Sequence, residues 1–192
     1  MAQRYDSLSE KLITFIQNQK IYFVGTAVDE GRVNISPKGM NSLRVLDSNR
    51  VVWLNVTGSG NETAAHVQDN PRMTIMFTAF EGSPMILRLY GQARAIHRQD
   101  ADWAELYAHF DAEPGARQIF DLSVDLVQTS CGMAVPLYDY KEDRRQLSVW
   151  AQNKGEAGIQ QYWQEKNQLS IDGQPTHIVS KNLSPPEEYA SD

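Results

Sequence analysis

The stretch VVWLNVTGSGNET, residues 51–63, joins an apolar strand pattern to a helical pattern through a turn of small residues. Such a turn can direct several backbone N–H groups to one point, and the dipole of the following helix adds partial positive charge there. That arrangement suits a phosphate. Ser59 and Glu62 also have the spacing of a capping box, which would use the same N–H groups without a ligand. Taken alone, the turn leaves both interpretations open.

The sequence on either side of this turn is dominated by strand patterns. Alternating or continuous apolar residues predict strands at about 21–28, 32–35, 50–57, 72–80, 85–96 and 122–135, and residues 29–31 predict a hairpin turn,. Helical patterns cover about 8–18, 61–68, 100–110 and 157–166. Many strands with few helices indicate a mainly β fold, an antiparallel barrel or sandwich with flanking helices.

The first helix has clear signals of its own. Ser7 and Glu10 have capping-box spacing, and an apolar stripe runs along one face through Leu8, Leu12, Phe15 and Ile16,. At the other end of the chain, residues 185–188 predict a polar tail.

Composition restricts the class of protein. The chain has 192 residues, of which 41% are hydrophobic, so we expect one domain spanning 1–192,. The net charge of −6 and the dispersed basic residues argue against nucleic acid as a partner,. We find neither an apolar run that could span a bilayer nor a signal pattern, and a single cysteine fits a reducing compartment,. These features predict a cytoplasmic protein with no membrane partner.

The histidines and serines do not form a recognisable catalytic or metal-binding pattern. His66, His97, His109 and His177 lie far apart without ligand-type spacing, so we expect packing or surface roles and no metal,. The nucleophile-elbow pattern G-x-S-x-G is absent from the sequence,.

Alternation within the strands sorts side chains onto two faces. In residues 50–57, Trp53, Asn55 and Thr57 lie opposite an apolar face. In residues 85–96, Arg88 and Tyr90 lie opposite another. We interpret these as outer faces, and large aromatic side chains there predict a surface covered by a second copy in a homodimer.

Four segments in order, SPKG at 36–39, NVTGSGNET at 55–63, NPR at 70–72 and LRLYG at 87–91, resemble the FMN-binding split-barrel family that includes pyridoxamine 5′-phosphate oxidase. The resemblance covers about 21–135. SCGMAVP at 130–136 and the region of Trp150 are similar to a subgroup distinct from the oxidase itself. SPKG also predicts an edge or bulge, because proline cannot donate within a sheet.

The resemblance implies a six-stranded antiparallel Greek-key split barrel that dimerises, with FMN bound between the subunits. The barrel would cover about 20–136, between a helix at about 7–18 and a helical extension at about 140–183. The resemblance implies Ser59, Asn61 and Thr63 for the phosphate, Lys38 and Arg88 for positive charge, and Ser36 and Asn55 for the ribityl chain or the ring edge. Thr57, on the same strand face as Asn55, is included among the cofactor-binding residues.

Two further residues carry alternatives. Cys131 would either approach the flavin of the partner subunit or pack as a small buried residue. Trp150 would either stack on the ring system or anchor a core or interface.

The sequence also departs from the oxidase pattern. The phosphate turn lacks the Arg-Lys of true pyridoxamine phosphate oxidases, and their C-terminal Arg-x-His segment is absent. We therefore expect an FMN-dependent oxidoreductase acting on another small organic molecule. A flavin carrier or sensor is the alternative, and a barrel that has lost its cofactor is a third. No catalytic residue is assigned, because flavin itself carries the electron chemistry.

Overall fold

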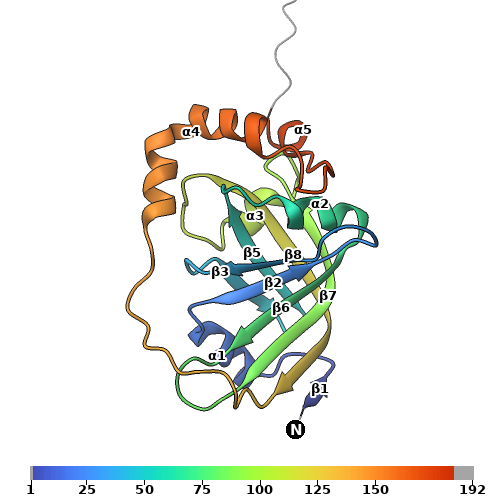
Figure 1. The fold of residues 1–192 in the computed structure, drawn as a ribbon, viewed down its shortest axis with the longest axis vertical. Coiled ribbons are helices and arrows are strands. Elements are labelled where there is room, and N and C mark those ends of the chain that lie inside the picture. Colours follow the sequence, from blue (N-terminus) through green and yellow to red (C-terminus); the bar gives the residue numbers. More distant parts are fainter. Residues whose placement is uncertain (1, 184–192) are drawn as a thin grey trace, which may run out of the picture.

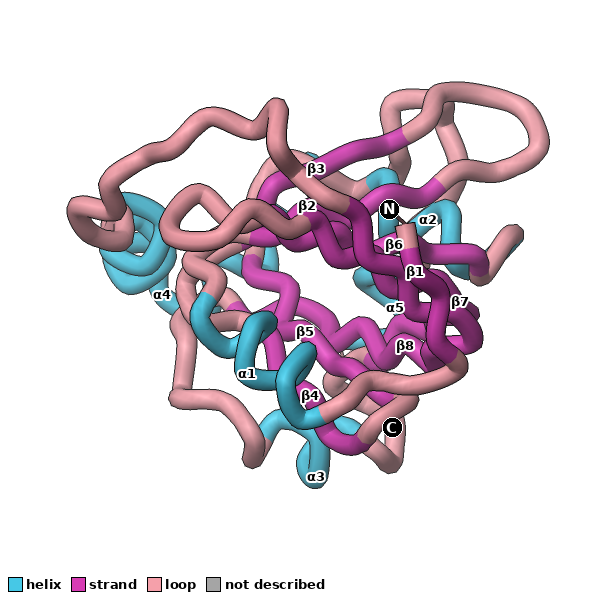
Figure 2. The backbone as a smooth tube through the Cα atoms, turned by 90° about the horizontal axis from the view of Figure 1, so that it is seen from below, coloured by secondary structure: helices cyan, strands magenta, loops and turns pink. Residues whose placement is uncertain are grey.

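In the computed structural model, which describes residues 2–183, eight strands form one antiparallel sheet in the order β3-β2-β6-β7-β8-β5-β4, with β1 paired to β8. The sheet curls around a central core (Figures 1 and 2). The strands are β1 (Gln3–Tyr5), β2 (Tyr22–Thr26), β3 (Asn34–Lys38), β4 (Leu43–Asp47), β5 (Arg50–Val56), β6 (Arg72–Thr78), β7 (Ile86–Ile96) and β8 (Ala116–Ser130). A short connection, residues 39–42, joins the two end strands β3 and β4.

Helices flank the barrel. They are α1 (Glu10–Asn18), α2 (Glu62–Asp69), α3 (Trp103–Tyr107), α4 (Gln146–Lys166) and α5 (Ile178–Asn182). Leu12 and Ile16 of α1 pack into the core cluster of the barrel, whereas α4 and α5 build a separate small core around Trp163. Figure 1 shows α4 and α5 (orange and red) together at the end of the barrel where α2 and α3 lie.

The predicted mainly β antiparallel fold with flanking helices is confirmed, with eight strands in place of six. The edge position predicted for SPKG is confirmed as well, because β3 is an end strand of the sheet. Within residues 2–183, no helix is both long enough and apolar enough to cross a membrane. The predicted tail at 185–188 lies outside the described residues.

Several element boundaries differ from the prediction. The strand predicted at 122–135 is β8, which begins at Ala116 because its polar early residues are buried against β5. The helix predicted at 157–166 begins at Gln146, and Gly155, with φ of 64°, kinks it and interrupts its pattern. The cap of α1 is Ser9, which accepts from the N–H of Leu12, and not Ser7. The helix predicted at 100–110 is only Trp103–Tyr107.

The predicted orientation of Trp53 is wrong. Trp53 is 1% exposed and stacks on Phe120 inside the barrel, with 4.6 Å between ring centroids. The opposite face of β5 is also covered, because Val52 and Leu54 pack in a second cluster beside α3. When both faces of a strand are buried, alternation separates the faces but does not identify the interior one.

Candidate functional site

A cavity of about 280 Å³ lies where the end of β3, the end of β5, the turn before α2 and the start of β8 meet. Its lining includes Lys38, Asn55, Gly58, Gly60 and Arg117. Residues far apart in the sequence, including the turn of small residues at 58–61, therefore face one space.

Arg117 is the buried cation of this cavity. It sits where the register between β5 and β8 shifts, and such bulges redirect side chains out of the regular ladder,. Its guanidinium donates to the carbonyls of Gly58 (3.3 Å) and Gly60 (2.8 Å) and to Oδ1 of Asn61 (3.2 Å). The residue is 2% exposed, and burial lowers its pKa to about 10. In residues 2–183, Arg117 has no ion-pair partner.

Lys38 supplies a second positive charge at the end of β3. It is half-buried, and its Nζ lies 5.1 Å from the ring centroid of Trp53. Burial lowers the pKa of Lys38 to about 8; the charge of Arg117 lowers it further and that of Glu62 acts in the opposite direction. The ion pairs of the described chain do not include Lys38 either. An anion placed near Lys38 and Arg117 would stabilise their charged forms.

Several buried hydrogen-bond donors at or near this cavity have no partner. Among residues 2–183, the buried donors Arg117 Nε, Trp53 Nε1 and Gln118 Nε2 have no partner, and neither has the Ser36 hydroxyl. Asn55 uses its Nδ2 to donate to Gln118 Oε1 at 3.0 Å. Unpaired buried donors are costly, so the free donors of the lining residues Arg117 and Trp53 favour a ligand with acceptor oxygens,.

Three of the residues that the resemblance implied for the phosphate or its surroundings are engaged within the chain. Asn61 Nδ2 donates to the carbonyls of Ser59, Lys166 and Leu169. Thr63 accepts from Asn34, and Thr57 joins Gly115 to Trp163. Ser59 is exposed in the turn. These side chains hold the turn in place, and the charged residues of the cavity lining are Lys38, Arg44, Asp111, Glu113 and Arg117.

Of the predicted capping box at the turn, the Glu62 carboxylate accepts a backbone N–H, but the Ser59 side chain does not cap α2. The N-cap of α2 is Asn61, with no side-chain cap, so Ser59 does not form the capping box. Glu62 accepts from the N–H of Asn61 (3.0 Å) and from the N–H of Ile171 (3.2 Å). The C-terminal extension thus reaches the start of α2.

Arg88 and Lys38 lie on opposite faces of the sheet. The register places Arg88, Met76, Phe23 and Pro37 in one row across four strands, so their side chains share a face, and Lys38 follows Pro37 onto the other,. Arg88 lies on the outer face as predicted and donates to the Ser130 hydroxyl at 3.3 Å. One chain therefore does not bring the two cations to one ligand atom.

The remaining candidates lie away from the cavity. Cys131 is exposed just after β8, so its interpretation as a buried residue is wrong. Trp150 is partly buried against the α4–α5 core and meets Tyr162 edge-on at 5.2 Å, as expected for a packing anchor. His66 and His97 are buried with Thr26 and Asn182 as partners.

Metal ligands do not cluster in the part of the chain that the structure describes. The buried cation of the cavity that the sequence did not predict is Arg117. Its only local signal is an arginine between Ala116 and Gln118, in a stretch that had not been predicted as strand.

Comparison with known proteins gives consistent results. The family model described as Pyridoxamine 5′-phosphate oxidase matches residues 8–131. A pyridoxamine 5′-phosphate oxidase family protein of Aspergillus flavus, ustO, is 35% identical over 191 residues, which cover 89% of this chain and 76% of that protein.

Two solved structures share the fold at low sequence identity. HupZ from Group A Streptococcus has a TM-score of 0.52 at 19% identity, covering 64% of this chain and 98% of that one. A candidate pyridoxamine 5′-phosphate oxidase from Lactobacillus delbrueckii has a TM-score of 0.51 at 20% identity, covering 64% of this chain and 94% of that one.

Proposed function

The chain belongs to the pyridoxamine 5′-phosphate oxidase family, and from that premise we propose that it is a flavoprotein that binds FMN with its phosphate at the Lys38–Arg117 cavity. We further propose that it is an FMN-dependent oxidoreductase of a small organic molecule. The observation that carries the proposal is the pair of cations without a carboxylate partner in the described chain.

The residues fit a phosphate monoester. Such a group carries about −1.5 to −2 charges at pH 7 by analogy with phosphorylated side chains. The lining offers it the cations Lys38, Arg44 and Arg117, beside the carboxylates of Asp111 and Glu113. Unpaired buried donors beside these cations match the three terminal oxygens of the phosphate,. The cavity volume of about 280 Å³ lies just below the usual range for ligand pockets, roughly 300–1,000 Å³, so the cavity suits the phosphate and part of the molecule,. The isoalloxazine would lie outside this cavity.

Bound flavin supplies the electron chemistry, and the protein residues bind and orient it. Lys38 and Arg117 fix the phosphate, and the carbonyls of Gly58 and Gly60 hold the Arg117 guanidinium. Asn55, at the cavity wall, is the residue placed to meet the ribityl chain. A flavin carrier or sensor is the second candidate; anaerobic bleaching of the bound flavin by a reduced nicotinamide would support the oxidoreductase, and the absence of bleaching would favour the carrier.

We expect the purified protein to be yellow and to release FMN, not FAD, on heating. The proposed site holds one phosphate, and the sequence has no G-x-G-x-x-G pattern for a dinucleotide,. Chromatography of the heat-released cofactor against both standards measures this. Recovery of FAD, or failure to bind any flavin after reconstitution, would refute the FMN assignment.

We also propose a homodimer that completes the site. Trp53 does not support this proposal, because its side chain is buried inside the barrel. Val33 and Ile35 are each 70% exposed beside the outer groove that Arg88 and half-buried Tyr90 line. A second copy on this face would cover the apolar residues and bring Arg88 to a shared ligand.

Sedimentation velocity at several protein concentrations, with and without FMN, tests this arrangement. We expect a dimer whose dissociation constant falls when FMN is present, because ligand binding and assembly are linked. A monomer that binds FMN as tightly as the assembled protein would contradict the shared site.

A further inference from the structure

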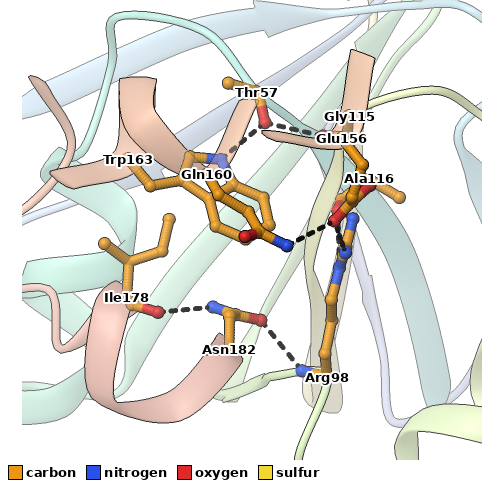
Figure 3. Close-up of polar contacts among 9 residues, drawn as sticks. All are labelled: Thr57, Arg98, Gly115, Ala116, Glu156, Gln160, Trp163, Ile178 and Asn182. Atoms are coloured by element: carbon orange, nitrogen blue, oxygen red, sulfur yellow. Dashed lines mark hydrogen bonds and ion pairs between the residues drawn. The ribbon is translucent and has the colours of Figure 1, made fainter. Parts of the chain in front are cut away.

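The C-terminal extension, residues 146–183, holds the ligand-binding turn although it follows the segment that matches the family. Trp163, fully buried in α4, donates from Nε1 to the hydroxyl of Thr57 at 2.8 Å (Figure 3). That hydroxyl donates in turn to the carbonyl of Gly115 at 2.7 Å. The end of β5 is therefore fixed from both α4 and the start of β8.

Within the extension, Asn167, directly after α4, makes the shortest hydrogen bond to the turn. Its Nδ2 donates to the carbonyl of Gly58 at 2.9 Å, and the residue is fully buried. In the reverse direction, Asn61 Nδ2 donates to the carbonyls of Lys166 (3.0 Å) and Leu169 (3.2 Å). The turn and the end of α4 thus exchange hydrogen bonds.

These bonds constrain the turn's amide groups through peptide geometry. In a planar trans peptide, the C=O of one residue and the N–H of the next point in opposite directions. The carbonyl of Gly58 is held by Asn167 and Arg117, and that of Gly60 by Arg117. The Gly58 carbonyl therefore faces Arg117 while the Ser59 N–H points away from it, and by fixing this carbonyl Asn167 helps to hold the Arg117 guanidinium in place.

We propose that Asn167 and Trp163 are positioning residues that hold the turn at 58–61, and through its carbonyls the donors of the Arg117 guanidinium, in place for a phosphate before it binds. This inference rests on the proposed function. Preorganised donors bind an anion more tightly than donors that must first be ordered, because the ordering cost is already met on folding.

The extension has other attachments, which make this role separable from its folding. Asn182 accepts from the N–H of Arg98 at 2.9 Å, and the Arg98 guanidinium donates to the carbonyl of Ala116 and to Glu156 (Figure 3). Ala151, Ile159 and Ile178 complete its core with Trp163. Losing one hydrogen bond to the turn leaves these contacts in place.

The test compares FMN with riboflavin, which lacks the phosphate. Asn167→Leu and Trp163→Phe keep most of the packing and remove the donors. We expect each to weaken FMN binding roughly fivefold to twentyfold in fluorescence titrations, with less than about a twofold change for riboflavin. Gln161→Ala, at an exposed α4 position, is the matched control and should bind both flavins as the parent does.

Equal losses for FMN and riboflavin, or no loss for either, would overturn the positioning role. Amide hydrogen exchange of the flavin-free proteins gives a second readout. We expect faster exchange at residues 58–61 in Asn167→Leu, with exchange in β6 and β7 unchanged. If the parent protein bound no flavin, the proposed function would fail, and the exchange at 58–61 would still decide whether Asn167 orders the turn.

Discussion

Replacing Arg117 by methionine is expected to weaken FMN binding by roughly thirtyfold to a hundredfold, the largest effect of any single change at the site. The substitution removes a buried charge facing the phosphate and also the donors that hold the carbonyls of Gly58 and Gly60. A charge-assisted hydrogen bond contributes about 1.5–3 kcal/mol, or roughly tenfold to a hundredfold in affinity. Flavin fluorescence quenching measures it.

Arg117→Lys separates charge from geometry. Lysine keeps the positive charge but lacks the planar fork that reaches several acceptors at once, so its affinity should lie between those of the parent and Arg117→Met. Riboflavin should be affected less than FMN by both variants. Unchanged FMN affinity in Arg117→Met would remove the phosphate from this cavity.

The other cation, Lys38, makes the same site sensitive to pH. Because burial lowers the pKa of Lys38 to about 8, FMN affinity should be highest between about pH 6, where the phosphate gains its second charge, and pH 8, and should fall above pH 8,. Lys38→Arg, which stays protonated, should abolish that fall. An affinity that stays constant from pH 7 to 10 in the parent would contradict the role of Lys38.

Lys38 also gives a signature that needs no flavin. Its pKa is lower in the folded protein than the ordinary value of 10.5, so the unfolded chain binds more protons between about pH 8 and 10.5. The free energy of unfolding of the ligand-free protein should therefore rise with pH across this window, and Lys38→Met should remove its contribution to that rise. Denaturant unfolding at several pH values measures this.

Gly91→Ala is expected to prevent stable folding. A Cβ at Gly91 of β7 would lie 1.9 Å from the carbonyl oxygen of Ser123 and 3.1 Å from the Cα of Val124, both backbone atoms of β8. The register between these strands shifts at this point, which brings the two backbones together,. Relief requires separating the two strands with the largest shared boundary in the barrel.

We expect a loss of at least about 3 kcal/mol in the free energy of unfolding, seen as insoluble expression or a collapsed denaturant midpoint. Gly25→Ala is the matched control, because it is also a strand glycine but has its nearest backbone neighbour at 3.8 Å. A soluble Gly91→Ala protein with parent-like stability would contradict so short a distance between the backbones of β7 and β8.

Local patterns predicted the β-rich fold because strand alternation and turn residues are properties of adjacent positions. They also predicted that SPKG lies at a sheet edge, since proline lacks a donor wherever it stands. They did not find Arg117, because its partners Gly58 and Gly60 are separated from it by more than fifty residues. Trp53 was predicted on the wrong face of β5 because α3 covers the opposite face, and this packing depends on tertiary structure.

The sequence predicted that the C-terminal extension is helical, but no local pattern predicted its contacts with the turn at 58–61. Trp163 and Thr57 are 106 positions apart, and each alone is an ordinary helix or strand residue. Glu62, predicted to serve a helix cap, divides its carboxylate between the start of α2 and the N–H of Ile171. Contacts of this range are set by topology and not by sequence periodicity.

The attachment of Asn167 to Gly58 has a consequence for biosynthesis. The last barrel strand ends at Ser130, and Asn167 leaves the ribosome 37 residues later. At about 5–20 residues per second, the last barrel strand is synthesised roughly two to seven seconds before Asn167, which completes the contacts of the turn. A nascent chain would thus form its barrel before it could bind the cofactor tightly. Flavin would therefore bind only after the C-terminal extension has been synthesised.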